Sequence, residues 1–278
     1  MHSALLPNGK MINARDYDSK LHGTRIVCMD PTCRAPVIFV QKSNDVSPYF
    51  KTTGKHESKH AETCGFYKTL SFTETIDKIS EYQDAFLNEG LAENIVRLNL
   101  NRLDPDYESR TAERDQSKEK DSSEIKIKDK NETPKSISSL KTLVRVLTSN
   151  EPDVLSSIIV QVRGMKIPIS SLVVNQARAH EVCWNDTVLS QFNYFVYGEV
   201  DKILRRDKVI YINFKPVNQV LFSIVIFDKY FPHFTFKDEE LLDKKILAWG
   251  QLRKNTYNDK NTTEMAIKSD RYIEYLPR

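Results

Sequence analysis

The sequence predicts an α+β protein of several domains, and three observations lead to this expectation. Three of the four cysteines lie close together near the N-terminus, beside histidines and among short β-type segments. The middle alternates between helical patterns and a stretch dense in charged and hydroxyl residues. The last third has the apolar patterning of consecutive β-strands. A chain of 278 residues is long enough for two or three such units.

Residues 1–66 are expected to form a small β-rich module. The turn Pro7-Asn8-Gly9-Lys10 separates two apolar segments, and Asn-Gly is a strong hairpin signal. The expected strands cover residues 3–6, 11–14, 25–28, 36–41 and 48–51. Residues 56–65 lack β-branched runs and have room for one or two helical turns.

The module carries a pattern of soft metal ligands: Cys28 and Cys33 form one pair, and His60 and Cys64 form a second. In a reducing compartment such a cluster indicates metal ligation rather than a disulfide. Four such side chains suit tetrahedral zinc (Zn²⁺), and a closed ligand set predicts a structural rather than a catalytic ion. Two alternatives stay open: His56 could replace His60 or support a ligand, and the cluster could be a coincidence of reactive thiols.

The first 65 residues or so resemble the N-terminal region of competence protein CoiA-like proteins, in which a β-hairpin precedes a Cys pair and a Pro-His-Phe-x-His element. The residues that carry the resemblance are Ala4-Leu5, Asn8-Gly9-Lys10, Asn13-Ala14, Cys28, Cys33, Ser47-Pro48-Tyr49-Phe50, His56 and His60. Tyr49 stands where that motif has its His. The nuclease half of that family is not evident downstream, since no carboxylate pair followed by a strand Glu-x-Lys is recognised. The resemblance therefore implies a zinc module, and it does not imply nuclease activity for this chain.

The middle of the chain is expected to hold three segments. Residues 67–103 have apolar side chains at helical spacing, and residues 139–190 are expected to be a helical packing segment, beginning with the stripe Leu140, Leu143, Val144 and Leu147. Between them, residues 104–138 are too rich in Lys, Glu, Asp, Ser and Thr to bury a core, which predicts a charged flexible linker. A long exposed charged helix is the alternative for that linker.

Residues 191–278 have the pattern of a five-stranded β-barrel. The expected strands are 194–200, 208–215, 219–227, 245–253 and 264–275, with a short helical turn from Asp238 between the third and the fourth. This order resembles oligonucleotide/oligosaccharide-binding (OB) folds that bind nucleic acid. In the second strand, Ile210, Ile212 and Phe214 are expected to face the interior, and Val209, Tyr211 and Asn213 the outside.

OB folds stack single-stranded bases on aromatic rings and contact phosphates with Lys and Arg. The resemblance therefore implies a set of candidate contacts: Tyr197, Lys202, Arg205, Arg206, Lys208, Tyr211, Lys215, Lys229, Tyr230, Arg253 and Lys254. The alternative is that the basic side chains in the turns are merely solvated and that Tyr211 packs under the preceding helical segment.

The net charge and the absence of known catalytic motifs limit the classes of function to consider. The formal charge is only +3, although both ends lean basic and the middle leans acidic, which agrees weakly with nucleic acid at the ends. No phosphate-binding loop, dinucleotide fingerprint or nucleophile elbow is present, so the sequence supports no enzymatic assignment, while a spatially assembled site stays open. No segment is apolar enough to span a membrane and residues 1–18 lack a secretory pattern, which predicts a cytoplasmic protein.

Together these features predict a non-catalytic protein with a structural zinc module and an OB fold that binds single-stranded DNA or RNA, with DNA favoured. The first alternative is a protein–protein adaptor in a replication, repair or phage-defence assembly. The second is a nuclease of the kind to which the N-terminal resemblance points.

Overall fold

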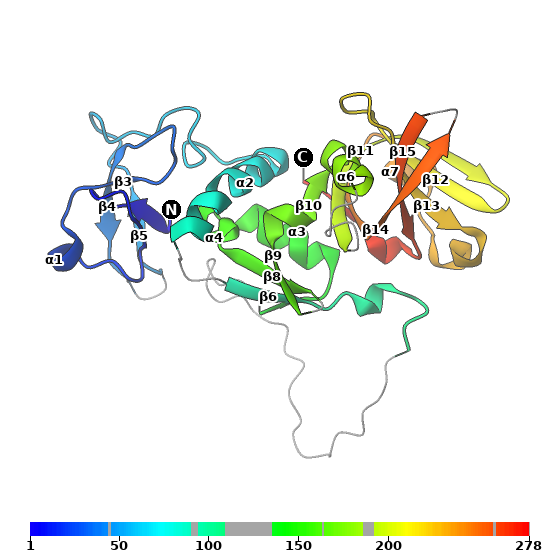
Figure 1. The fold of residues 1–278 in the computed structure, drawn as a ribbon, viewed down its shortest axis with the longest axis horizontal. Helices are drawn as coiled ribbons and strands as arrows, with labels where there is room; N and C mark the ends of the chain where they lie inside the picture. Colours follow the sequence, from blue (N-terminus) through cyan, green and yellow to red (C-terminus); the bar gives the residue numbers. More distant parts are fainter. Residues whose placement is uncertain are drawn as a thin grey trace, which may run out of the picture.

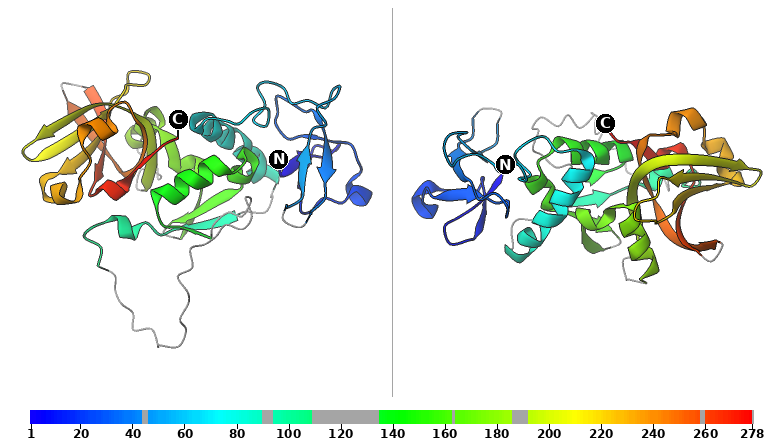
Figure 2. Two further views of the ribbon diagram at one scale, coloured as in Figure 1. Left: turned by 180° about the vertical axis from the view of Figure 1, so that it is seen from behind. Right: turned by 90° about the horizontal axis from the view of Figure 1, so that it is seen from above.

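The computed structural model describes residues 1–43, 46–89, 94–108, 135–162, 164–185, 192–257 and 260–277. Three parts follow one another along the longest axis of the molecule (Figure 1). They are an N-terminal module, a middle part of helices and strands, and a C-terminal ring of strands, and the views from behind and above show the same order (Figure 2). Among the helices of the described residues, none is long and apolar enough to cross a membrane.

The N-terminal module is built on an antiparallel sheet with the order β2-β1-β3-β4-β5. Its strands are β1 (Ser3–Leu5), β2 (Met11–Asn13), β3 (Ile26–Cys28), β4 (Pro36–Val40) and β5 (Tyr49–Lys51), with the short helix α1 (Ser19–His22) between β2 and β3. The predicted hairpin is confirmed, with Leu5 opposite Met11 and Gly9 at a φ of 81° in the turn. Residues 56–65 form successive turns and bends rather than the helical turns that we expected.

The middle part begins with helix α2 (Phe72–Glu89), but the helical expectation for residues 67–103 is wrong beyond it. Residues Asn94–Leu98 form strand β6, which pairs in parallel with β8 (Ile158–Val162) so that Ile95 lies opposite Ile159. Short apolar runs of β-branched residues fit a helix or a strand, and here a partner strand far along the chain decides the outcome.

The predicted linker lies mostly outside the described residues, and only its two ends are seen. The 3₁₀ turn η1 (Asn101–Leu103) precedes the first end, where Asp104 and Asp106 accept hydrogen bonds from the ammonium of Lys268 at 2.7 and 3.1 Å. At the other end, β7 (Ser136–Ile137) adds a strand to β6 and completes the sheet β7-β6-β8-β9.

Residues 139–184 combine helices and strands. Ser139 caps helix α3 (Leu140–Ser149) by accepting a hydrogen bond from the backbone of Thr142, and the predicted apolar stripe of this helix is buried. The remaining elements are α4 (Pro152–Ser156), β8, β9 (Met165–Pro168), α5 (Ile169–Leu172), β10 (Val173–Asn175) and α6 (Gln176–Trp184). The helical expectation for residues 139–190 is therefore corrected where β8 and β10 form, because β8 pairs with β6 and β10 pairs with β11 of the ring.

The C-terminal part is a ring of five strands in the order β11-β12-β13-β15-β14, closed by pairing of β14 with β11. The strands are β11 (Asn193–Arg206), β12 (Val209–Phe214), β13 (Phe222–Phe227), β14 (Lys245–Tyr257) and β15 (Lys260–Ile267). Only β13 and β15 run parallel within the ring. The 3₁₀ helix η3 (Asp228–His233) and the expected helical turn α7 (Asp238–Leu241) separate β13 from β14.

Two strands extend this sheet, and one of them corrects the predicted last strand. Residues 264–275 are interrupted by the 3₁₀ turn η4 (Asp270–Tyr272), after which β16 (Ile273–Tyr275) pairs with β14. Strand β10 pairs in parallel with β11 and so ties the middle part to the ring. One hydrophobic core runs from α2 and α3 through β11 to the interior of the ring.

The interior of the ring is filled as the alternation in β12 predicted. Ile210, Ile212 and Phe214 are buried, while Val209, Tyr211 and Asn213 are partly exposed. The ring of Phe214 lies directly against the backbone of Gly198 in β11, where a Cβ atom would come within 2.2 Å of Phe214 Cδ2. Gly198 is thus a position of close approach between two elements of the core.

We predict that Gly198→Ala destabilises the ring by about 1–3 kcal/mol, because the added methyl group overpacks the core against Phe214. Urea unfolding followed by the fluorescence of Trp184 and Trp249 measures the change. The double variant G198A/F214L should lose less stability than the two single variants added together, since the smaller side chain relieves the overlap. An unfolding midpoint of G198A equal to that of the wild type would contradict this packing.

Candidate metal centre and candidate nucleic-acid interface

The four predicted metal ligands meet at one point of the N-terminal module. Cys28 ends strand β3, Cys33 lies in the turn that leads to β4, and His60 and Cys64 lie in the turns that follow β5. The three Sγ atoms and one imidazole nitrogen lie within 4.8 Å of one another. The sequence pattern therefore identified side chains that the fold brings together.

Three of the distances between the ligand atoms are close to those around a tetrahedral ion. Cys28 Sγ lies 3.7 Å from Cys64 Sγ, and His60 Nδ1 lies 3.4 Å from the Sγ atoms of both Cys33 and Cys64. Around zinc, with Zn–S bonds of about 2.3 Å and Zn–N bonds of about 2.0–2.1 Å, tetrahedral geometry places sulfurs about 3.8 Å apart and S···N pairs about 3.6 Å apart. The cluster could therefore hold zinc with little rearrangement.

The surroundings of the sulfurs also suit a cation. Cys28 and Cys64 are buried, and backbone N–H groups of Ala61 and Phe66 point at Cys33 Sγ and Cys64 Sγ at 3.4 Å. The contact with Cys64 and then burial raise the pKa of the Cys28 thiol, while the same contact lowers the pKa of Cys64. Burial lowers the pKa of His60, which favours the neutral imidazole that binds metals.

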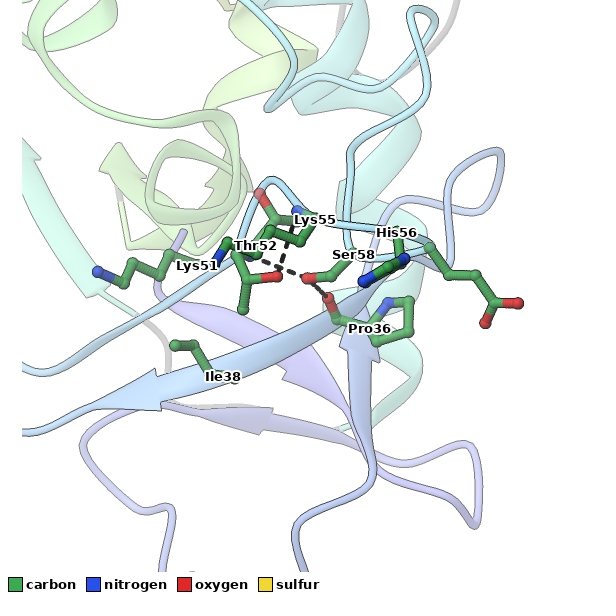
Figure 3. Close-up of a pocket in the computed structure, with 9 residues that line it drawn as sticks. Pro36, Ile38, Lys51, Thr52, Lys55, His56 and Ser58 are labelled. Carbon is green, nitrogen blue, oxygen red and sulfur yellow. Dashed lines mark hydrogen bonds between the residues drawn. The ribbon is translucent and has the colours of Figure 1, made fainter.

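His56, the alternative ligand, is not part of this cluster. Its side chain is exposed and lines a groove formed by strands β4 and β5 and the turn after β5 (Figure 3). Its backbone has a positive φ of 48°, which turns the chain between β5 and the segment that carries His60. The structure thus favours His60 in the ligand set.

A buried carboxylate, Asp30, lies in the loop between Cys28 and Cys33 and ties the two halves of the centre together. Its Oδ1 accepts hydrogen bonds from the backbone and hydroxyl of Thr32, at 2.9 and 2.6 Å. Its Oδ2 accepts the backbone N–H of Gly65, next to ligand Cys64, at 3.0 Å. Lys78 and Tyr82 of helix α2 also donate to Oδ2, so the same carboxylate joins the module to the middle part.

The ionised form of Asp30 is favoured despite its burial. Desolvation alone would raise its pKa, but the hydrogen bonds from Thr32, Tyr82 and Gly65 hold the pKa of this carboxyl below its usual value. In return, burial and the Asp30 carboxylate raise the pKa of the Tyr82 hydroxyl, which stays a donor. The glycine is required as well, since a Cβ on Gly65 would lie 2.4 Å from the Tyr82 hydroxyl.

The predicted nucleic-acid contacts divide into two groups, of which the first lies on the outer face of the ring. The guanidinium of Arg206 lies 5.9 Å from the ring centre of Tyr211, and that of Arg253 lies 5.8 Å from the ring centre of Phe227. Lys202 and Lys208 are exposed on β11 and in the β11–β12 turn. Cations and half-exposed aromatic rings thus lie together on β12 and β13 and beside them.

The second group has other partners. Tyr197 and Tyr230 are buried: Tyr197 packs edge-on against Phe72, and Tyr230 donates to Asp106. The ion pairs and ring contacts of the four remaining cations are Arg205 with Asp238, Lys215 with Glu199 and Asp243, Lys229 over Tyr230, and Lys254 over Trp184. Burial therefore engages Tyr197 and Tyr230 within the protein, and ion pairs engage Arg205 and Lys215. Lys229 and Lys254 lie over rings as Arg206 and Arg253 do, and the contact of all these residues with nucleic acid stays a prediction.

Two residues of these sites escaped the sequence reasoning. Asp30 resembles an ordinary turn residue before Pro31, and only the fold shows its burial. Phe227 ends the apolar run of β13, where its 37% exposure depends on which face of the strand it occupies. Strand alternation from Phe222 onward could have placed it, because residues two apart share a face.

Comparisons with known proteins neither support nor contradict a function for this chain. No family model matches the chain, and no curated protein matches it. A solved structure of asparaginyl-tRNA synthetase from Entamoeba histolytica, in complex with asparaginyl-adenylate, is similar over 39% of this chain and 24% of that chain. The sequence identity is 15% and the TM-score is 0.22, and a similarity at that level carries no argument about fold or function.

We predict that His60→Ala purifies without zinc, whereas the matched variant His56→Ala retains about one zinc ion per chain, because only His60 belongs to the cluster. Elemental analysis of the purified proteins measures the metal content. Removal of zinc from the wild type with a chelator should lower the unfolding temperature of the module, since the binding free energy of a structural ion is folding free energy. Equal zinc content in the two variants would refute this ligand set.

We predict that Tyr82→Phe lowers the free energy of unfolding by about 1–3 kcal/mol, because it leaves the buried Asp30 carboxylate without one of its donors. Tyr67→Phe is the matched control, since Tyr67 is 52% exposed. Urea unfolding compares the two variants. Faster loss of zinc to a chelator from Y82F than from Y67F would show in addition that Asp30 holds the ligand loops in place.

Proposed function

We propose that this chain is a non-catalytic, cytoplasmic protein in which an OB fold, residues 191–278, binds single-stranded nucleic acid, with DNA favoured over RNA. Residues 1–66 are proposed to be a zinc module of the CoiA-like kind with a structural role. The observation that carries the proposal is the pairing of cations with half-exposed aromatic rings on the outer face of the strand ring.

The order of the strands supports the OB assignment. Numbered along the ring part alone, they run 1-2-3-5-4 and close back to 1, with strands 3 and 5 parallel and a helical segment between strands 3 and 4. A five-stranded Greek-key barrel of the OB kind has this strand order, which supports the proposal. In that fold, ligands bind across strands 2 and 3, which here are β12 and β13.

The chemistry of that face supports a single-stranded ligand. Tyr211 and Phe227 offer flat apolar surfaces to bases, and Arg206 and Arg253 lie over those rings, where a guanidinium can meet a phosphate. Beyond Tyr211 on the same face, the hydroxyl of Ser223 donates to the side-chain oxygen of Asn213 at 2.7 Å, so polar groups for base edges also lie on these strands. Stacking of this kind is tolerant of sequence, so weak sequence preference is expected.

The zinc module is proposed to stabilise the fold rather than to catalyse a reaction. Four protein ligands complete a tetrahedral sphere and leave no position for water, which catalytic zinc requires. Backbone hydrogen bonds to the sulfurs and the Asp30 network restrain the ligand loops further.

We predict that the purified protein binds a fluorescein-labelled, unstructured single-stranded oligonucleotide, and that Arg206→Gln/Arg253→Gln weakens binding at least about tenfold at low salt. Two charge-assisted contacts are lost, and the slope of log K against log salt should fall by about 1.4, at about 0.7 for each phosphate contact on a single strand. Fluorescence anisotropy at several salt concentrations measures both quantities.

The matched control is Lys141→Gln/Arg145→Gln, which removes the same charge from the exposed side of helix α3. It should change the affinity less than about twofold, because screened surface charges act weakly at a distance. Undetectable binding of the wild type at low salt would overturn the proposal and leave the adaptor alternative. Metal-dependent cleavage of the oligonucleotide would favour the nuclease alternative instead.

A further inference from the structure

Lys229, Tyr230 and Lys268 form a cation cluster at one end of the strand ring. Strands β13 and β15 run parallel and pair Ile226 with Ile267, so the residues that follow the two strands lie at the same end of the ring. Lys229 and Tyr230 follow β13, and Lys268 follows β15. The ammonium groups of Lys229 and Lys268 lie 4.4 and 5.5 Å from the centre of the Tyr230 ring. Two positive charges thus lie beside one aromatic ring.

An acidic segment, Asp104-Pro105-Asp106, lies on this cation cluster. The ammonium of Lys268 donates to the carboxylate of Asp104 at 2.7 Å and to that of Asp106 at 3.1 Å. The hydroxyl of Tyr230 donates to Asp106 at 2.7 Å. Strand β6 and the turn η1 bring the acidic segment from the middle part of the molecule to the ring (Figure 1).

The cation cluster has the chemistry of an anion site. Its two ammonium groups repel each other, and an anion between them offsets that repulsion. The hydrogen bonds from Tyr230 and then from Lys268 lower the pKa of the Asp106 carboxyl, which favours its charged form. Phosphate oxygens accept the same charge-assisted hydrogen bonds from lysine and tyrosine side chains. The two carboxylates therefore lie where phosphate oxygens of a bound strand would be accepted.

The cation cluster adjoins the proposed nucleic-acid face. Phe227, one of the two rings offered to bases, immediately precedes the η3 segment that carries Lys229 and Tyr230. The pair formed by Ile226 and Ile267 also places Phe227 beside Lys268, one residue further along each strand. A strand whose base stacks on Phe227 would therefore bring a phosphate close to Lys268.

The acidic segment is held by contacts that can be exchanged. The side chains of Asp104 and Asp106 are 31% and 56% exposed, and ion pairs at such exposure are weak. The residue before them, Leu103, is buried in the core, and its carbonyl accepts the hydroxyl of Ser269 at 2.9 Å. The two carboxylates can thus leave the lysines while the turn η1 stays anchored.

We infer that Lys229 and Lys268 form a phosphate subsite of the nucleic-acid face, and that Asp104 and Asp106 occupy this subsite until a bound strand displaces them. The acidic segment is then an internal competitor that lowers the affinity for nucleic acid. This inference rests on the proposed function of the OB fold and deepens it by adding a regulated contact to the same face. Ion pairs that only attach the end of β6 to the ring would leave nucleic-acid binding unchanged.

The first test compares two doubly substituted full-length proteins by anisotropy with a labelled oligo(dT) of about 30 nucleotides. Asp104→Asn/Asp106→Asn removes the competing carboxylates, and Asp201→Asn/Glu239→Gln removes two exposed carboxylates elsewhere on the ring part. We expect the first variant to bind about fivefold more tightly at low salt, because no ion pair has to be broken. Its salt slope should be steeper by about 0.7, for one more net phosphate contact, and the control should change the affinity less than about twofold.

A second comparison asks whether the gain passes through Lys268. In the wild type, Lys268→Gln removes the competitor's partner and the phosphate's partner together, so the affinity should change less than about twofold. In the D104N/D106N protein the same substitution should abolish the gain. Unfolding midpoints confirm that all variants are folded.

Displacement of the acidic segment is measured directly by hydrogen exchange. The backbone N–H of Asp106 donates to the Asp104 carboxylate at 2.9 Å, and that of Tyr107 donates to the Asp104 carbonyl at 3.1 Å. Addition of oligo(dT) should therefore speed exchange in a peptide covering residues 101–107, since competition between two ligands is reciprocal. Slower or unchanged exchange on binding would contradict displacement.

The outcomes separate the two proposals. If R206Q/R253Q weakens binding while D104N/D106N behaves like D201N/E239Q, the inference is wrong and the OB proposal stands. If neither the wild type nor D104N/D106N binds the oligonucleotide, the OB proposal fails and the inference falls with it. If K268Q lowers the affinity by the same factor in both backgrounds, the gain reflects only the loss of negative charge, and the inference is overturned.

Discussion

The hydrogen bonds that converge on the buried carboxylate of Asp30 are the constraint on which the N-terminal half of the structure depends. They connect the loop between the first two metal ligands to Gly65, beside the fourth ligand, and to Tyr82 of helix α2. A buried charge is costly unless its donors are all in place, so the loops, the glycine and the helix are fixed together. The geometry of the metal centre and the contact of the module with helix α2 therefore share these hydrogen bonds, and Asp153 of α4 makes a second link by accepting the backbone N–H of Ser3 at 2.8 Å.

Helix α2 carries this constraint into the rest of the protein. Phe72, Ile76 and Ile79 lie in the core that continues to the strand ring, whereas Tyr82 and Phe86 lie in the core of the N-terminal module. One amphipathic segment thus takes part in two hydrophobic cores. Each core is stabilised by burying some of the apolar residues of this helix. Loss of the metal centre is therefore expected to destabilise the helix as well as the module.

The proposed ligand surface lies at the other end of the molecule from this constraint (Figure 1). It is the outer face of β12 and β13, where Arg206 and Arg253 lie over aromatic rings. Its geometry depends on the closed strand order β11-β12-β13-β15-β14 and on the filled interior of the ring. The zinc module and the ring are therefore held by different interactions: hydrogen bonds to a buried carboxylate in the first, and strand pairing around an apolar core in the second.

The sequence by itself determined the features that rest on local chemistry. These are the candidate ligand pairs Cys28/Cys33 and His60/Cys64, the N-terminal hairpin and the inward alternation of β12, because spacing within a pair, turn residues and a period of two are local properties. Only the tertiary structure decided the rest. Residues 94–98 form a strand because β8 pairs with them, and Tyr197 is buried because it packs against Phe72. Such outcomes depend on which distant segments meet, and a sequence pattern read over a short window does not contain that information.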